Sequence, residues 1–128
     1  MVDLMAKGSA WLDQQRHRFL TRPVTYQRGA STVALQATVG RTVFRFDDHA
    51  GNVTRYVSRD FLVRASDLVL DGYPATPKRG DRIREPHGQR VMIHEVMAPG
   101  RDEPDWRYSD PDRQTLRIHT KQTGVEST

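Results

Sequence analysis

The sequence predicts a mainly β fold: a small β-barrel or sandwich of about six or seven strands, with an N-terminal α-helix. Three observations lead to this fold class. From Pro23 onward, apolar residues alternate with polar ones in short runs, as in half-buried strands. Clusters of Gly, Asp, Asn and Pro separate the runs at the spacing of turns in sandwiches and barrels. The chain's 128 residues are enough for one domain with a modest core.

The N-terminal segment, residues 1–22, is expected to be helical over 3–20. Apolar side chains, among them Trp11 and Phe19, recur near one face of that stretch at helical spacing. Pro23 ends the pattern, because the residue before a proline is disfavoured in the α conformation. Packing of this helix on the sheet is the favoured role, and packing on a neighbouring subunit is the alternative.

The β domain is expected over residues 23–121. Residues 65–70 are expected to form a helical turn capped by Ser66, and residues 72–78 a connector. Residues 98–105 form a loop, and Ser109 to Asp112 a turn that follows Trp106-Arg107-Tyr108. The expected strands lie around residues 24–26, 33–39, 43–46, 60–64, 83, 91–97 and 116–120.

Two polar stretches interrupt or end this pattern. Residues 47–58 begin with a cluster of turn formers and are weakly patterned, which predicts a long, mobile loop. Residues 122–128 are polar and are expected to be a flexible tail. Both segments are therefore available for contacts with partners.

The tripeptide Arg79-Gly80-Asp81 resembles the motif that adhesion ligands present to integrins. A chance match has odds of about one in ten in a chain of this composition, so the motif alone is weak. Gly and Asp also supply the backbone geometry of a turn between a proline-rich connector and a strand. The chain has no cysteine and hence none of the disulfides expected of a small extracellular ligand. A turn is the favoured interpretation.

The composition narrows the function classes. Without cysteine there is no thiolate nucleophile, disulfide or cysteine zinc site. No apolar run approaches the roughly 18 residues of a membrane span, and the N-terminus lacks a signal-peptide pattern. We therefore expect a soluble, cytoplasmically made protein with no membrane contact. The net charge is +4, and 17 of the 20 basic residues are arginine. Arginine is favoured where carboxylates or phosphates are paired, although codon usage also explains such a bias.

The titratable residues carry no recognisable catalytic or metal pattern. The histidines show none of the spacings of a zinc site, so a structural or surface role is favoured. The acid clusters at 102–105 and 110–112 contain proline and indicate solvated turns. We predict no enzyme activity, no metal and no cofactor. The five histidines are His17, His49, His87, His94 and His119.

Several arginines and aromatic residues are candidates for contacts. Arg16 and Arg18 lie at the end of the expected helix, where cations complement the helix dipole or form a basic rim. Arg82 and Arg84 share one strand face by the period of two and can contact phosphate without reading sequence. Trp106 and Tyr108 also share a face, as core or interface anchors.

The order of motifs in the second half resembles phage head–tail joining proteins, the head-completion or stopper proteins of the lambda type. The chain reads Pro77-x-x-Gly80-Asp81-x-Ile83, then a turn at His87-Gly88 and an apolar strand ending in Glu95-Val96. A polar loop and a last strand at 116–120 follow. The stretch Asp60-Phe61-Leu62-Val63-Arg64 and the polar region before it also look like that family. The resemblance covers roughly residues 33–120.

This resemblance implies a structural protein of the virion neck, assembled in the host cytoplasm. It would form a six- or twelve-fold homo-oligomeric ring between portal or adaptor and tail, and would close the head after DNA packaging. Contact with the packaged DNA stays open. The candidate contacts with neighbouring subunits or partners are Trp11, Arg16, Arg18, Phe19, Asp48, His49, Asn52, Arg55, Arg82, Arg84, Trp106 and Tyr108.

Two other functions remain as alternatives from the residues themselves. A nucleic-acid-binding small β-barrel is supported by the net charge, and steep salt dependence of DNA binding would identify it. A small hydrolase lacks any nucleophile constellation, and a substrate-turnover screen would address it.

Overall fold

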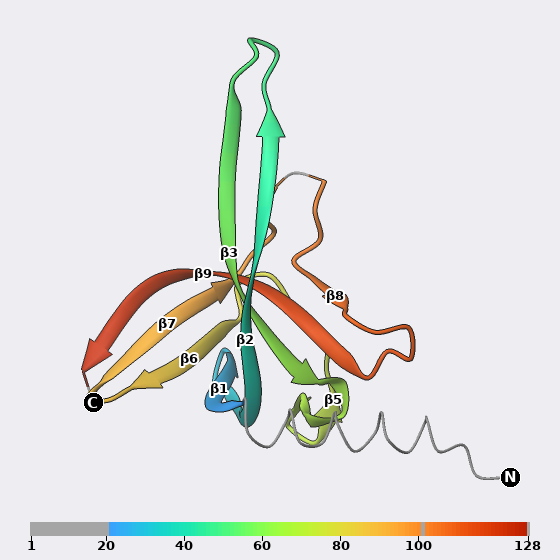
Figure 1. The fold of residues 1–128 in the computed structure, drawn as a ribbon. Coiled ribbons are helices and arrows are strands. Elements are labelled where there is room, and N and C mark those ends of the chain that lie inside the picture. The colour runs from blue at the N-terminus through green and yellow to red at the C-terminus, as the bar shows by residue number, and fades with distance from the viewer. Residues whose placement is uncertain (1–20, 101, 128) are drawn as a thin grey trace, which may run out of the picture.

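The computed structural model describes residues 21–100 and 102–127, and the described part is mainly antiparallel β-sheet (Figure 1). The predicted helix over 3–20 lies outside the described residues. One 3-10 turn, η1 (Ala65–Asp67), interrupts the strands. The strands are β1 (Arg22–Arg28), β2 (Ser31–Asp47), β3 (Val53–Arg64), β4 (Val69–Leu70), β5 (Tyr73–Pro74), β6 (Arg82–His87), β7 (Arg90–Val96), β8 (Trp106–Tyr108) and β9 (Thr115–Ser127).

Seven strands form the main sheet in the order β3-β2-β1-β6-β7-β9-β8, and all its pairings are antiparallel. The first half of β9 also pairs with β3, while its second half pairs with β7. Pairing therefore runs from β3 through β2, β1, β6, β7 and β9 back to β3, so that these six strands form a closed series. The predicted mainly β fold is confirmed, although β2, β3 and β9 are long rather than short strands.

The core follows from the period-two alternation that the sequence shows. Val24 on β1 opposes Leu35 on β2, Tyr26 and Ala37 lie two residues further along the same face, and all four side chains are buried. Corresponding positions on the other strands complete one hydrophobic cluster. Its remaining buried members are Phe61, Val63, Leu68, Leu70, Ile83, Val96, Leu116 and Ile118.

The β2–β3 hairpin extends far beyond this core (Figure 1). Its pairing runs without interruption from Thr38 opposite Leu62 to Asp47 opposite Val53. Residues 48–52 form the turn at the tip. The prediction of a long loop over 47–58 was therefore wrong for Asp47, which ends β2, and for residues 53–58, which belong to β3. Their polar composition hid the strand, because its order comes from pairing with β2 and not from burial of apolar side chains.

Two further expectations are corrected by the structure. Residues 122–127 are not a free tail but the second half of β9, hydrogen-bonded to β7. The 3-10 turn at 65–67 has the predicted position, but its N-cap is Arg64 and no side chain caps it. Ser66 therefore does not have the capping role that the sequence suggested.

The Arg79-Gly80-Asp81 stretch is a turn whose acid points into the protein. Gly80 has a φ of +94°, a region that residues with a side chain rarely adopt. The Asp81 carboxylate is buried and accepts hydrogen bonds from the Tyr26 hydroxyl, from Arg28 Nη2 at 2.8 Å and from Lys78 N at 3.0 Å. Burial and the Asp81 contact raise the pKa of Tyr26. An integrin could not reach this carboxylate, so the motif is structural.

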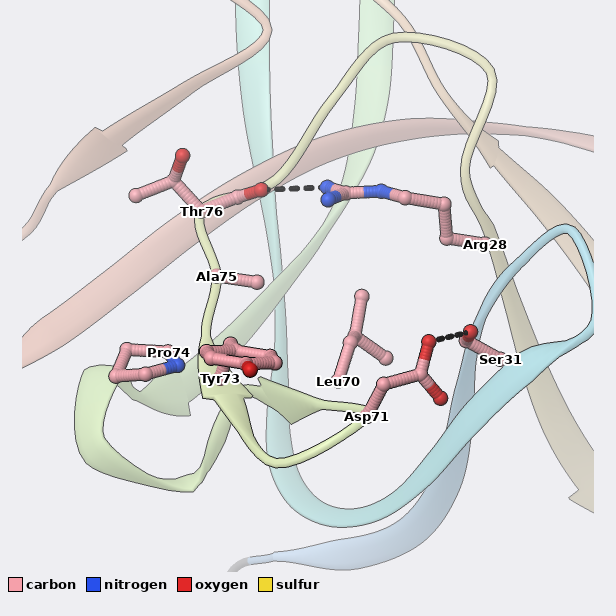
Figure 2. A pocket seen from close by; sticks show the side chains of 8 residues that line it. All are labelled: Arg28, Ser31, Leu70, Asp71, Tyr73, Pro74, Ala75 and Thr76. Carbon is pink, nitrogen blue, oxygen red and sulfur yellow. Dashed lines mark hydrogen bonds between the residues drawn. The ribbon is translucent and has the colours of Figure 1, made fainter.

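The segment expected as a connector after residue 70 contains a small hairpin. Asp71 and Gly72, both with positive φ, join β4 to β5 in the two-residue turn that Asp-Gly favours. An open groove separates this hairpin from the β1–β2 turn (Figure 2). Two hydrogen bonds already join residues of its lining, since Arg28 donates to the Thr76 carbonyl and Ser31 to Asp71.

We predict that Asp81→Asn destabilises the fold by about 2 kcal/mol, because a buried charged acceptor with three donors is lost. Urea unfolding followed by circular dichroism measures this change. Asp67→Asn is the matched control, because Asp67 is exposed, and it should alter stability by less than about 0.5 kcal/mol. Equal stability of Asp81→Asn and the wild type would contradict the structural role of the turn.

Candidate interaction surface on the β2–β3 hairpin

The β2–β3 hairpin is a two-stranded ribbon with two different faces. Residues directly opposite each other in antiparallel strands share a face, and the face changes at every step along the strand. The pair Val39–Phe61 lies on the core side, so the pairs at 41–59, 43–57, 45–55 and 47–53 continue the core face outward. The pairs at 40–60, 42–58, 44–56 and 46–54 form the opposite face. Each face is held at its base by a buried carboxylate.

On the core face, the base of the hairpin is tied to Glu85 of β6. This carboxylate is fully buried and accepts hydrogen bonds from Arg59 Nε at 2.9 Å and Nη2 at 2.7 Å. Arg22 Nη1 lies at 2.6 Å, and the Nε2 atoms of His87 and His94 each at 3.0 Å. Burial alone would raise the pKa of Glu85, but the arginines outweigh it and lower the pKa to about 2. The charged form of Glu85 therefore fixes Arg59 and with it β3.

On the opposite face, the base of the hairpin is tied to β9 through Asp60. Its buried carboxylate accepts hydrogen bonds from Ser58 Oγ at 2.5 Å, from Arg117 Nε at 2.7 Å and from Thr42. His119 Nδ1 lies at 2.8 Å. Burial alone would raise the pKa of Asp60, but the hydrogen bonds from His119, Ser58 and Thr42 lower it to about 2. Nothing in the sequence indicated that Asp60 and Glu85 are buried anchors of the hairpin, because a lone acid in a strand usually faces solvent.

Further out, this opposite face is covered by aromatic contacts and by the loop after β7. The ring of Phe44 meets His119 edge-on at 5.3 Å and lies 6.4 Å from Tyr56. The ring of Phe46 lies so close to Gly100 that a side chain at position 100 would collide with it. The loop therefore runs against one side of the hairpin and supports it.

The continuation of the core face carries arginine and valine and is exposed. Arg41 opposes Arg59, Val43 opposes Val57, and Arg45 opposes Arg55. We call this the arginine–valine face. Val43 is 38%, Val57 48% and Val53 62% exposed. Within the described part of the chain, the guanidinium groups of Arg41, Arg45 and Arg55 have no ion pair, while Arg59 is held by Glu85. Asp47 opposes Val53 and adds one exposed carboxylate at the outer end of this face. The complete set is Arg41, Val43, Arg45, Asp47, Val53, Arg55, Val57 and Arg59.

Such a face is costly unless it has a partner. Like charges directly opposite each other destabilise a strand pair, and exposed valines lose the benefit of burial. A surface of this kind suits an anionic partner that also brings apolar side chains. The alternation of arginine and valine in both arms, at 41–45 and at 53–59, is the sequence signal that would have revealed it.

The tip of the hairpin is a polar, structured turn. Asp48 accepts hydrogen bonds from Ala50 N at 2.9 Å, from Asn52 N at 2.8 Å and from Asn52 Nδ2 at 3.0 Å. The bonds from Asn52 lower the pKa of Asp48. His49 is exposed between them. Asp48 thus shapes the turn that presents His49 at the most distant point of the hairpin.

The other candidates from the sequence are placed on different parts of the protein. Arg82 is exposed on β6, and Arg84, on the same face as predicted, forms an ion pair with Glu126. Trp106 and Tyr108 on β8 meet edge-on at 5.2 Å, and Trp106 packs on the core. Only Asp48, His49, Asn52 and Arg55 come together on the hairpin. Trp11, Arg16, Arg18 and Phe19 lie outside the described residues.

Over 21–100 and 102–127, no group of three or more acidic or histidine side chains is arranged to hold a metal ion. Within the same residues, no helix has the length and hydropathy of a membrane span.

We predict that stability falls as the pH is lowered from about 4.5 toward 2. Glu85 and Asp60 have folded pKa values of about 2, below their ordinary values of 4.5 and 3.8. The unfolded chain therefore takes up protons first, and the contribution of each carboxylate, on the order of 2–3 kcal/mol, is lost in this window. Urea unfolding at a series of pH values measures the slope.

Glu85→Gln should lower stability at pH 6 and flatten this slope. Glu126→Gln is the matched control, because its ion pair with Arg84 is at the surface and is worth little. A slope that is unchanged in Glu85→Gln would show that Glu85 does not titrate with folding.

Comparison with known proteins supplies the context for this surface. Among curated proteins, none matches the chain. The family described as phage head-tail joining protein matches residues 2–127, almost the entire sequence. This match includes the whole β2–β3 hairpin and confirms the resemblance seen in the sequence. The chain therefore belongs to the phage head-tail joining protein family.

Proposed function

We propose that this protein forms a ring in the neck of a tailed phage particle, between the portal or adaptor and the tail, and helps to close the head after DNA packaging. Family membership carries this proposal. The family is a structural component of the virion that joins heads to tails. The ring, its position in the neck and the closing of the head are the steps that we add.

The hairpin supports a joining role through its reach. Seven residues from Arg41 to Asp47 span roughly 20 Å at strand geometry. This length extends beyond the core, and its base is fixed on both faces by Glu85 and Asp60. A ring of such subunits would present a set of tips, each ending in Asp48, His49 and Asn52, to the adjoining ring. Fixed tips reduce the entropy that is lost on docking.

A nucleic-acid-binding role is the second candidate, and the unpaired arginines of the hairpin are the observation that favours it. Salt dependence separates the two functions. Binding to double-stranded DNA would fall steeply with salt concentration, because phosphate contacts release counterions. In the ring proposal, any DNA contact is non-specific and secondary to contacts with proteins.

Antibody labelling of particles from the source, viewed by electron microscopy, tests the location. We expect label at the neck, between head and tail, and ring-shaped assemblies in the purified protein. Label elsewhere on the particle, or particles without label, would refute the neck assignment.

A second prediction concerns the tip. Replacing residues 48–52 by Asn-Gly keeps the Asp47–Val53 pair and supplies a two-residue hairpin turn. We expect an unchanged fold, since Glu85, Asp60 and their partners remain, but at least a tenfold loss of heads joined to tails. Counting joined particles after complementation of a phage that lacks this protein measures the effect.

The shorter replacement is preferable to removing residues 47–58, because that deletion takes away Ser58, a hydrogen-bond donor to Asp60. Thr54→Ala is the matched control, because Thr54 is exposed on the hairpin but lies outside the turn, and this variant should join heads to tails normally. Normal joining with the Asn-Gly tip would show that the tip does not dock.

A further inference from the structure

We propose that the arginine–valine face binds the acidic segment at residues 102–112 of a second copy of this chain. The proposal rests on the ring proposed above and names the contact between neighbouring subunits. Contacts in which two different patches meet generate a ring when the rotation between neighbours closes, and an open filament when it does not.

The acidic segment has the complementary charge. It holds five carboxylates and one arginine in a chain whose net charge is +4. Asp102, Glu103 and Asp112 are exposed and, within the described residues, have no ion pair. The exposed side chain of Tyr108 adds apolar surface to the same segment. The carboxylates match the arginines, and Tyr108 matches the valines.

The backbone of the acidic segment is held in place before any contact. The Asp105 carbonyl accepts a hydrogen bond from His119 N at 2.9 Å. The Asp110 carboxylate accepts hydrogen bonds from Thr115 N at 2.8 Å and Gln114 N at 3.0 Å. Electrostatic complementarity between two ordered surfaces fixes register and partner choice.

The two patches point in different directions on one subunit. The loop that leads into the acidic segment packs on the opposite face of the hairpin, where Gly100 meets Phe46. Arg45, the residue before Phe46, points to the arginine–valine face. The hairpin itself therefore separates its arginines from the acids of its own chain, so that the acids of a neighbour are the ones available.

The valines distinguish this partner from DNA. Phosphate contacts need cations alone, whereas Val43, Val53 and Val57 would stay exposed on a phosphate backbone. A protein partner buries them, which adds a favourable apolar term to the ion pairs. The arrangement of valine pairs between arginine pairs thus favours a second copy of the chain.

Disulfide cross-linking tests the contact, because the chain has no cysteine of its own. We expect the Val57→Cys, Glu103→Cys double variant to give a ladder of linked multimers under oxidising conditions, both in purified rings and in particles. Each single variant should give no ladder. Thr54→Cys with Glu103→Cys is the matched control, because Thr54 is exposed on the opposite face of β3.

Charge reversal gives an independent readout. Adding Arg45→Glu and Arg55→Glu to the cross-linking pair should reduce the ladder at least tenfold, and further addition of Asp102→Lys and Asp112→Lys should restore it. Dimers from Val57→Cys alone would overturn the proposal in favour of a two-fold contact. Rings without a ladder would overturn the contact but keep the ring. If the cross-linking pair gives no ladder, and particles with Arg45→Glu and Arg55→Glu lose their packaged DNA, the arginine–valine face would be assigned to contact with DNA phosphates instead.

Discussion

Two neighbouring residues of β3 determine how the hairpin stands on the protein. Arg59 and Asp60 point to opposite faces of the strand, and each ends in its own buried ion cluster. A buried charge without its partner is strongly unfavourable, so neither side chain can leave its cluster cheaply. The strand is thus tied to β6 on one face and to β9 on the other. Rotation or sliding of the hairpin would break one cluster or both.

The exposed half of the hairpin depends on this attachment. An isolated two-stranded ribbon is only marginally stable in water, and this one also carries opposed arginines on its open face. The contacts of Phe44 with His119 and of Phe46 with Gly100 extend the support along the other face. The arginine–valine face can therefore remain uncovered in the free subunit and still be presented in one orientation.

The sequence predicted the parts of this arrangement that have a local pattern, and it missed the parts that depend on pairing or contact between separate segments. The strand at 91–97 and the turn at Gly80 have local signals, namely alternation and turn residues, and both were correctly placed. Residues 53–58 are a strand because they pair with 42–47 across the hairpin turn, and residues 122–127 are a strand because the distant β7 pairs with them. Neither stretch has the apolar pattern that would mark it as a strand. The burial of Glu85 likewise depends on Arg22, which lies 63 positions away, and no local pattern shows such a contact.

The distribution of charge also constrains how subunits can meet. A two-fold contact through the hairpins would bring the arginines of one copy against those of the other, and juxtaposed like charges cost several kcal/mol. A head-to-tail contact places the same arginines against the acids of residues 102–112. Since basic and acidic patches lie on different sides of each subunit, every added copy leaves one patch of each sign open. Closure of the series into a ring would satisfy both patches of every copy, whereas an open series leaves one patch exposed at each end.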